Sequence, residues 1–394
     1  MKALPRLALL AALLLAAVNL RPGITSLAPL IERIAEELAL SRGLISLTTA
    51  LPVLCMGLLA PLAPRLAVRF GLERTVLGCL LLIALALMLR AFGHSSGLLI
   101  GSAALVGMGI AVAGPLLSGF IKRHFVGQVG QIIGWYSLGM TIGGTVGAVL
   151  TLPVTQLLGG DWAFGLAFWT LPALLAALLW LRVPNVRESA HEAATGGLPW
   201  RVTRAWLVTG FFALQAGLFY ALATWLVARY HEAGLSVLRS NTLFSLFMMV
   251  GLVSAFVLPW LTQRFGNRYL LLMGCSLSSA LCLGMITFAP GFLPELWALL
   301  LGLSLTGSFA LSMSLPLFET DTPLEVSRWT AMMLFVGYCL SSLTPVLAGL
   351  GRDLAGSYRL PFLVLTLLAL LMSFLAWRLK ASPRSAAPQA PAGA

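Results

Sequence analysis

Arg21 is the residue of this sequence whose type and position most directly suggest chemistry. It lies about fifteen residues into the apolar run 7–32, roughly 20 Å along a helix that rises 1.5 Å per residue. If this run spans a membrane, an arginine at mid-depth costs roughly 2.5–3.5 kcal/mol to insert. We therefore expect its guanidinium to face a polar space inside the protein.

Pro22 and Gly23 follow Arg21 directly and predict an interruption of the helix. A new half-helix beginning at Pro22 would direct free N–H groups and a positive dipole end toward the guanidinium. Such a pair is typical of an anion site. A unit anion about 4 Å away, at an effective dielectric near 20, would gain roughly 4 kcal/mol. The competing interpretation is that Arg21 binds the carbonyl groups of the unwound segment and acts as a staple.

Other polar residues of the apolar runs are candidates for the same site. Thr25 shares the face of Arg21 if the helix continues, whereas Asn19 does so only if the break redirects the chain. The seventh run offers Gln215 and Tyr220 on a partly polar, partly aromatic face. The predicted substrate-binding residues are Arg21, Asn19, Thr25, Tyr136, Gln215 and Tyr220.

Three more residues are candidates for a gate or a substrate path. Arg90 closes the third run near the outer surface, where a side chain reaching out to the interface is the simplest interpretation and a place on the path is the alternative. Tyr338 occupies in the eleventh run a place like that of Tyr136 in the fifth. Arg69 lies in a basic loop whose expected partners are the acids Glu319, Asp321 and Glu325.

The acidic residues and histidines are absent from the middle of the apolar runs. All 13 acids and all 4 histidines fall at the ends of runs or in loops. Proton-coupled transporters usually keep such a group at membrane depth, and an intramembrane hydrolase needs a base there. No Cys or His spacing resembles a metal site. We expect neither an enzyme, nor a metal, nor a cofactor.

The composition defines the class of protein. Of the 394 residues, 59% are hydrophobic and 10% are charged, whereas soluble domains are about 25% charged. The mean hydropathy is +0.95. Apolar runs broken by charges, Gly and Pro predict an all-α membrane protein with twelve membrane-spanning helices. The first run also fits a signal peptide, but because eleven more follow we interpret it as an uncleaved helix.

The basic residues predict the orientation. They occur singly or in pairs between apolar runs, so the net charge of +12 indicates topology rather than a nucleic-acid partner. With the N-terminus inside, most Lys and Arg residues fall in the inner segments. We therefore expect both termini in the cytoplasm, the lipid bilayer as the surroundings, and a bacterial inner membrane.

The longest polar stretch before the tail divides the spans six and six. Arg69-Phe70-Gly71 closes the second span and Arg264-Phe265-Gly266 closes the eighth, so the halves repeat. We predict a six-helix bundle at 1–181, a cytoplasmic linker at 182–203, a second six-helix bundle at 204–380, and a disordered tail at 381–394. Two pseudo-symmetric halves of this kind are the organisation of a major-facilitator transporter.

The fifth span carries glycines at a spacing of four, at Gly139, Gly143 and Gly147. Small residues at this spacing let two helices approach closely. Exporters often have a glycine-rich fifth helix, but packing alone would produce the same pattern.

Several segments together resemble the cyanate-permease and 2-nitroimidazole-permease family of the major facilitator superfamily. The resemblance covers nearly the whole chain, excepting the central loop and the tail. The matching segments are Asn19-Leu20-Arg21-Pro22, Thr25-Ser26, Pro29-Leu30, Leu47-Thr48-Thr49-Ala50-Leu51-Pro52, Arg90, Ile121-Lys122-Arg123-His124-Phe125 and Trp135-Tyr136-Ser137. The resemblance implies twelve helices, a bacterial inner membrane, and a small substrate that is often anionic or planar.

The sequence thus predicts a monomeric transporter that moves a small, cyanate-like anion by alternating access around Arg21. Export of a 2-nitroimidazole-like or other small drug compound is the alternative within this class. A membrane sensor or scaffold without transport is the alternative from another class, although it gives no reason for a lone arginine beside a helix break.

Overall fold

The computed structural model describes residues 6–92, 94–184, 197–265, 267–320 and 322–381. Within these ranges, twelve helical segments are long and apolar enough to cross a membrane. Most of the predicted linker and nearly all of the predicted tail, 185–196 and 382–394, lie outside the described residues.

The first six crossings form one half of the molecule. Its helices are α1 (Arg6–Asn19), α2 (Pro22–Thr25), η1 (Ala28–Leu30), α3 (Ile31–Glu37), α4 (Arg42–Ile45), α5 (Leu47–Leu59), α6 (Leu62–Phe70), α7 (Leu72–Leu89), η2 (Arg90–Phe92), α8 (Ser96–His124), α9 (Val129–Leu157), α10 (Trp162–Ala167) and α11 (Thr170–Trp180). The second half contains α12 (Thr203–Glu232), α13 (Val237–Phe265), α14 (Arg268–Phe288), α15 (Pro294–Glu319), α16 (Pro323–Ser341), α17 (Leu343–Ala355) and α18 (Arg359–Ala381). The described residues contain no strand.

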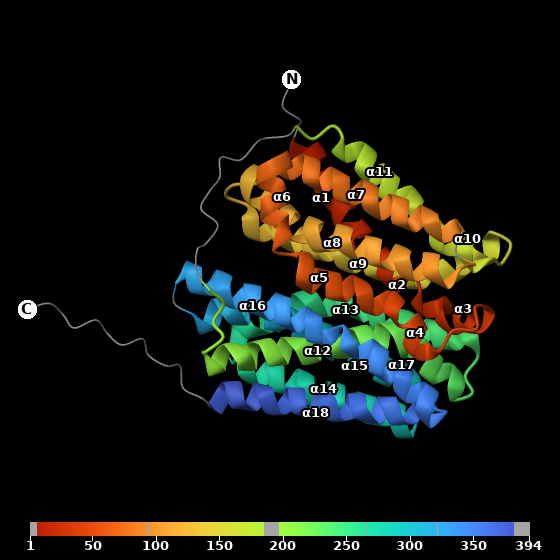
Figure 1. Cartoon of the computed structure of the whole chain (residues 1–394). Coiled ribbons are helices and arrows are strands. Elements are labelled where there is room, and N and C mark those ends of the chain that lie inside the picture. The colour runs from red at the N-terminus through yellow and green to blue at the C-terminus, as the bar shows by residue number, and fades with distance from the viewer. Residues whose placement is uncertain (1–5, 93, 185–196, 266, 321, 382–394) are drawn as a thin grey trace, which may run out of the picture.

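The two halves lie side by side with their helices roughly parallel (Figure 1). Long apolar segments become helices in a membrane because each backbone N–H and C=O must find its partner within the segment. Large side chains such as Leu171, Leu178 and Leu367 are more than half exposed, as expected of surfaces that face lipid rather than water. The predicted twelve-helix, two-half fold is confirmed.

The crossings give the bundle two ends. The chain begins at α1 and leaves α18 on the same side, where α6 and α7 also meet; we call this the Arg69 end. The turn there requires Gly71, whose φ of 90° strains any residue with a side chain. The opposite side, the Glu32 end, carries α3, α4, α10 and the turn from α17 to α18.

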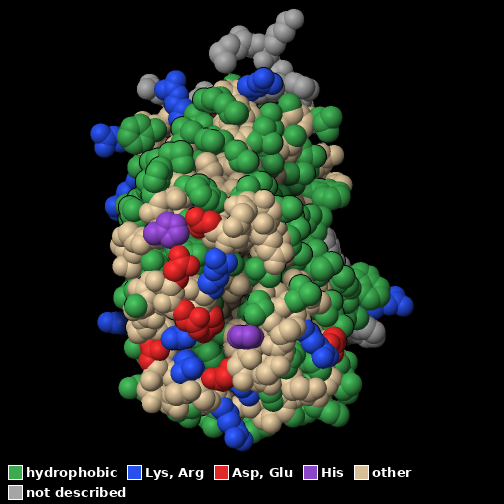
Figure 2. All heavy atoms as spheres, turned by 90° about the vertical axis from the view of Figure 1, so that its right-hand side faces the viewer, with side chains coloured by type: hydrophobic (Ala, Val, Ile, Leu, Met, Phe, Trp, Pro, Cys, Tyr) green, Lys and Arg blue, Asp and Glu red, His purple; other side chains and the backbone are tan. Residues whose placement is uncertain are grey.

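The middle of the Glu32 end is charged. Figure 2 views the molecule from this end, and acidic, basic and histidine side chains gather there within a hydrophobic surround. The helix packed most completely inside the bundle is α12, whose residues 220–230 are all buried.

Candidate functional site

The predicted helix break is present. Helix α1 ends at Asn19, Arg21 caps the next helix with φ −114° and ψ −36°, and Pro22 is the first residue of α2. Helix α2 has only four residues, so the strong dipole that we expected from a half-helix is not formed. The positive charge at the break therefore comes from the guanidinium of Arg21.

Helix α9 holds the break in place through its glycines. A Cβ added at Gly143 would lie 1.9 Å from the Val18 carbonyl oxygen, and one at Gly147 would lie 2.9 Å from the Cα of Pro22. Gly139 meets Ala17 in the same way, at 3.2 Å. The packing interpretation of this glycine pattern is confirmed, because α1 and α2 approach α9 too closely for larger residues.

Arg21 lies between the two halves and remains partly exposed. Its Nη1 donates to the hydroxyl of Tyr220 at 3.4 Å, and its Cζ lies 6.0 Å from the centre of the Phe219 ring. In the part of the chain that the structure describes, no carboxylate lies within 4.0 Å of the guanidinium, and its hydrogen bond is to a hydroxyl rather than to a carbonyl. The cation is therefore available to a ligand.

Three tyrosines from three helices lie near Arg21. Tyr136 on α9, Tyr220 on α12 and Tyr338 on α16 all interact electrostatically with the guanidinium. Tyr338 packs edge-on against Phe212, with ring centres 5.2 Å apart. The candidate site thus combines Arg21 and Tyr136 of the first half with Tyr220 and Tyr338 of the second. It offers one cation, several O–H donors and aromatic faces.

The structure does not bring the other predicted binding residues against the guanidinium. Asn19 donates from Nδ2 to the carbonyls of Leu15 and Pro172, at 2.8 and 3.1 Å, and so ties α1 to α11. The hydroxyl of Thr25 donates to the Arg21 carbonyl at 3.3 Å.

Gln215 also makes a bond between helices. It is 1% exposed, and its Nε2 donates to the Leu305 carbonyl at 3.0 Å. The spacing in the sequence predicted the depth of Asn19, Thr25 and Gln215 in the membrane. It did not predict that their side chains would point away from the guanidinium of Arg21.

The expectation that Arg90 reaches toward the interface is wrong. Arg90 is fully buried inside the first half, where its Nη2 donates to the Gly23 carbonyl at 2.9 Å and its Nε donates to Ser102 at 3.2 Å. The carbonyl of Gly23 belongs to the break that carries Arg21. Arg90 therefore positions this break rather than lining a path at the surface.

Replacing Arg90 by methionine should lower the stability of the protein and weaken substrate binding. The buried Gly23 carbonyl would lose its partner, which costs about 1–3 kcal/mol. We expect a lower midpoint of thermal unfolding and a higher KM for transport, because the break would no longer be held. Arg90→Lys should recover only part of both losses, since one ammonium group cannot reach Gly23 and Ser102 with the geometry of the guanidinium.

The control for Arg90 is Arg33→Met, at an exposed arginine on α3. This variant should change neither the midpoint nor KM. Wild-type values of both quantities in Arg90→Met would contradict the positioning role.

Two of the three expected acidic partners of the loop, Glu319 and Glu325, do not pair with Arg69. The guanidinium carbon of Arg69 lies 5.2 Å from the ring centre of Phe70. Glu319 instead binds Arg204 and Tyr269, and Glu325 caps its own helix at Thr322. Asp321 lies outside the described residues.

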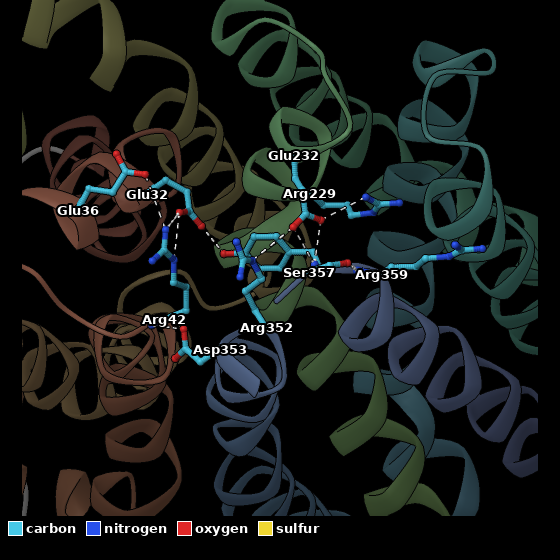
Figure 3. A network of polar contacts seen from close by, with 10 residues as sticks. Glu32, Glu36, Arg42, Arg229, Glu232, Arg352, Asp353, Ser357 and Arg359 are labelled. Atoms are coloured by element: carbon cyan, nitrogen blue, oxygen red, sulfur yellow. Dashed lines mark hydrogen bonds and ion pairs between the residues drawn. The ribbon is translucent and has the colours of Figure 1, made fainter. Parts of the chain in front are cut away.

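A cluster that the sequence analysis missed joins the two halves at the Glu32 end (Figure 3). The carboxylate of Asp353 on α17 accepts the backbone N–H groups of Arg42 and Gly43, at 3.1 and 3.0 Å. Arg42 forms an ion pair with Glu32 at 2.8 Å, and the hydroxyl of Tyr358 donates to Glu32. We call Glu32, Arg42, Glu232, Arg352, Asp353 and Tyr358 the Glu32 cluster.

Glu232, at the end of α12, extends the cluster within the second half. Its Oε2 accepts the backbone N–H of Tyr358 at 2.8 Å, and its Oε1 lies 3.4 Å from Nε of Arg352. Burial, together with the charge of Glu32, raises the pKa of Tyr358 above its usual range, so this hydroxyl remains a donor at neutral pH.

One feature of the sequence could have indicated the Glu32 cluster. All of its members fall at span ends that the alternating topology brings to one side.

Glycines at the Glu32 end allow the halves to touch. A Cβ added at Gly349 would lie 2.5 Å from the Arg42 carbonyl oxygen, and one at Gly43 would lie 2.5 Å from Cδ2 of Leu350. The helix contacts between the halves that involve α17 reach α4 and α5. The protein is therefore closed at the Glu32 end in this structure.

A polar site between two six-helix halves defines a multi-pass membrane transporter. A family model described as Major Facilitator Superfamily matches residues 9–323. The chain belongs to the major facilitator superfamily. Among the described residues, no group of three or more His, Cys, Asp or Glu side chains is placed to hold a metal ion.

Two relatives match nearly the whole chain. The cyanate transport protein CynX of Escherichia coli (strain K12) is 33% identical over 353 residues, which cover 89% of this chain and 91% of the relative. A 2-nitroimidazole transporter of the same organism is 29% identical, covering 93% and 94%. The crystal structure of a D-xylose-proton symporter superposes with a TM-score of 0.76 at 14% identity, covering 96% and 97%, which shows the shared fold.

Proposed function

We propose that this transporter moves a small, planar, monovalent anion of the cyanate type, with Arg21 as its docking point. The observation that supports the proposal is the partly exposed guanidinium between the two halves, without a carboxylate partner in the described ranges. The relative named as a cyanate transport protein points to the same class of solute.

The energetics favour a ligand at this place. An arginine at mid-membrane costs roughly 2.5–3.5 kcal/mol to insert. Among the residues that the structure describes, no carboxylate neutralises the charge of Arg21. An anion about 4 Å away would return roughly 4 kcal/mol at an effective dielectric near 20. The hydroxyls of Tyr136, Tyr220 and Tyr338 offer hydrogen bonds to the anion, and the ring of Phe219 offers a flat apolar contact.

Alternating access follows from the way the site is divided. Arg21 and Tyr136 move with the first half, and Tyr220 and Tyr338 move with the second, so rocking of the halves opens the site alternately to each side. The state described here is closed by the Glu32 cluster. We assign the Glu32 end to the outside and the Arg69 end to the cytoplasm of a bacterial inner membrane. The protein works as a monomer.

A second candidate is export of a 2-nitroimidazole-like compound. It is favoured by the aromatic side chains beside Arg21, namely Phe219 and the three tyrosines, and by the relative named as a 2-nitroimidazole transporter. A neutral planar ring would depend mainly on these aromatic groups, whereas an anion would depend mainly on Arg21.

The two candidates are separated by uptake into proteoliposomes that contain the purified full-length chain. Labelled cyanate is the test solute, and other small anions and 2-nitroimidazole are the competitors, each with and without a proton gradient. We expect saturable cyanate uptake that small anions inhibit more strongly than 2-nitroimidazole does. Saturable movement of 2-nitroimidazole that anions do not inhibit would replace the anion proposal by the second candidate.

A further inference from the structure

Met56, a residue that was not predicted from the sequence, lies at the Arg21 site. It is on α5 of the first half, and its Sδ lies 3.9 Å from the hydroxyl oxygen of Tyr220 on α12. The same hydroxyl oxygen accepts the hydrogen bond from Nη1 of Arg21 at 3.4 Å. The hydroxyl of Tyr220 therefore lies between a cation and a thioether.

The direction of these two hydrogen bonds follows from their partners. A guanidinium can only donate, so the hydroxyl oxygen of Tyr220 accepts from Arg21. A thioether has no proton to donate, so the hydroxyl proton of Tyr220 points toward Met56. Among the residues that the structure describes, the sulfur of Met56 is the acceptor of this proton.

The sulfur of Met56 is a weak acceptor, which distinguishes Tyr220 from the donors that follow it on α12. The hydroxyl of Thr224 donates to the Tyr220 carbonyl at 2.7 Å, and Nε1 of Trp225 donates to the Pro345 carbonyl at 2.8 Å. Carbonyl oxygens bind these protons firmly, and both side chains are buried. The hydroxyl proton of Tyr220 is held more loosely, so a ligand at Arg21 can take it.

Close packing on both sides keeps Met56 at this distance from Tyr220. A Cβ added at Gly107 of α8 would lie 2.4 Å from the Cα of Pro52, on the same helix as Met56. A Cβ added at Gly57 would lie 2.9 Å from the Phe335 carbonyl oxygen on α16 of the second half. Because both contacts are to backbone atoms, α8 and α16 leave α5 little room to move.

We propose that Met56 is a specificity-determining residue of the Arg21 site, which holds the hydroxyl proton of Tyr220 until an anion accepts it. This proposal rests on the proposed function, because the anion must first bind at Arg21. The bound anion then receives the N–H groups of Arg21 and, in place of the thioether, the O–H group of Tyr220.

The chemistry of this exchange defines which anions benefit. A hydrogen bond to an ionised acceptor is stronger than one to a neutral acceptor, and it strengthens further when the charge is concentrated on a small oxygen or nitrogen atom. Cyanate and formate have such atoms, whereas the charge of thiocyanate is spread over a large, soft sulfur. Met56 thus shifts the selectivity of the site toward cyanate and formate relative to thiocyanate.

Replacing Met56 by glutamine tests this role in proteoliposomes that take up labelled cyanate. Glutamine has nearly the length of methionine, but its carbonyl is a strong acceptor that would retain the proton of Tyr220. We expect KM for cyanate and the inhibition constant of formate to rise about fivefold, the value of one ordinary hydrogen bond. The inhibition constant of thiocyanate should rise by less than about twofold, since it gains little from this bond.

Replacing Met56 by leucine should have the opposite effect. Leucine removes the weak acceptor without supplying a stronger one, so the proton of Tyr220 has no partner until the anion binds. We therefore expect KM for cyanate to fall about twofold, because a weak bond no longer competes with the anion. A residue that only fills space would raise KM in both variants. An increase in the leucine variant, or an unchanged KM in the glutamine variant, would overturn the proposal.

A double-mutant cycle identifies the hydroxyl as the cause. Tyr220→Phe removes the proton and should itself raise KM for cyanate. Adding Met56→Gln to Tyr220→Phe should change KM by less than about 1.5-fold, because no proton remains to be retained. A fivefold increase in both backgrounds would contradict the proposal. Thermal unfolding midpoints of all variants are measured in parallel, and Met56→Leu gives an independent result if Met56→Gln unfolds.

Met88→Gln is the matched control, because it makes the same exchange at a methionine of α7 that is 46% exposed. This variant should have the wild-type KM and the wild-type order of inhibitors. A wild-type protein that takes up no cyanate would refute the proposed function and, with it, this proposal. Cyanate uptake that depends on Arg21 but responds equally to Met56→Gln and Met88→Gln would overturn only the role of Met56.

Discussion

Replacing Arg21 by glutamine should lower the initial rate of cyanate uptake into proteoliposomes at least 20-fold. The substitution removes the cation but keeps a polar side chain of similar length at the helix break. Half of the roughly 4 kcal/mol attraction between the guanidinium and an anion is already more than a tenfold change in affinity. The effect should appear mainly as a higher KM, since the anion loses its docking point.

Two further variants test whether charge is the cause. Arg21→Lys keeps the charge but loses the fork of donors, so it should retain part of the uptake. Arg6→Gln removes an exposed arginine from the start of α1 and should transport like wild type. Cyanate uptake by Arg21→Gln at the wild-type rate would mean that Arg21 is not the docking point.

Replacing Gly349 by valine should slow transport strongly without unfolding either half. Gly349 on α17 faces α4 of the other half, where a Cβ would lie 2.5 Å from the Arg42 carbonyl oxygen and 2.7 Å from its carbon. Because both atoms are backbone, α4 and α17 must separate, and closure at the Glu32 end becomes unfavourable. We expect uptake to fall at least tenfold while the thermal unfolding midpoint of the protein changes little.

Hydrogen–deuterium exchange reports this separation directly. The amides of Arg42 and Gly43 donate to Asp353 in the closed state, so they should exchange faster in Gly349→Val. Gly101→Val is the matched control, because a Cβ at Gly101 meets nothing within 4 Å. Unchanged exchange at Arg42 and Gly43 together with normal uptake would show that the halves need not approach this closely during transport.

Much of the fold followed from the order of apolar and polar residues. The first predicted span, 7–32, became the segment Arg6–Glu37, and the last, 359–379, became Arg359–Ala381. Span positions are predictable because one property, apolar length, decides them in a membrane. The break at Arg21 was predictable for a similar reason, since Pro22 cannot continue the helix before it.

The direction of a polar side chain around its helix was harder to predict. Arg90 stands where a surface arginine is expected, yet it points inward to Gly23. Gln215 lies one turn from Phe219, yet it donates to α15 rather than facing Arg21. The depth of a side chain in the membrane follows from its position along the helix. The face of the helix that is buried depends on which other helix packs against it, and that helix comes from a distant segment of the chain.

The Glu32 cluster was missed for a related reason. Glu32, Asp353 and Tyr358 are each ordinary residues at the ends of spans, and only the assembled halves bring them together. By contrast, Arg21 and Tyr220 were predicted as members of one site because their spans hold equivalent places in the two halves. The repeat thus helped at mid-depth, where positions in the two halves correspond, and not at the Glu32 end, where the loops of the two halves differ.

Asp353 closes the Glu32 end by binding main-chain amides rather than side chains. Every residue except proline supplies such an amide, so mutations that exchange side chains in α4 leave these two donors in place. Substitutions at Asp353 should therefore change the stability of the closed state more than substitutions of side chains in α4 do through these two hydrogen bonds, although the Arg42 side chain has its own ion pair with Glu32.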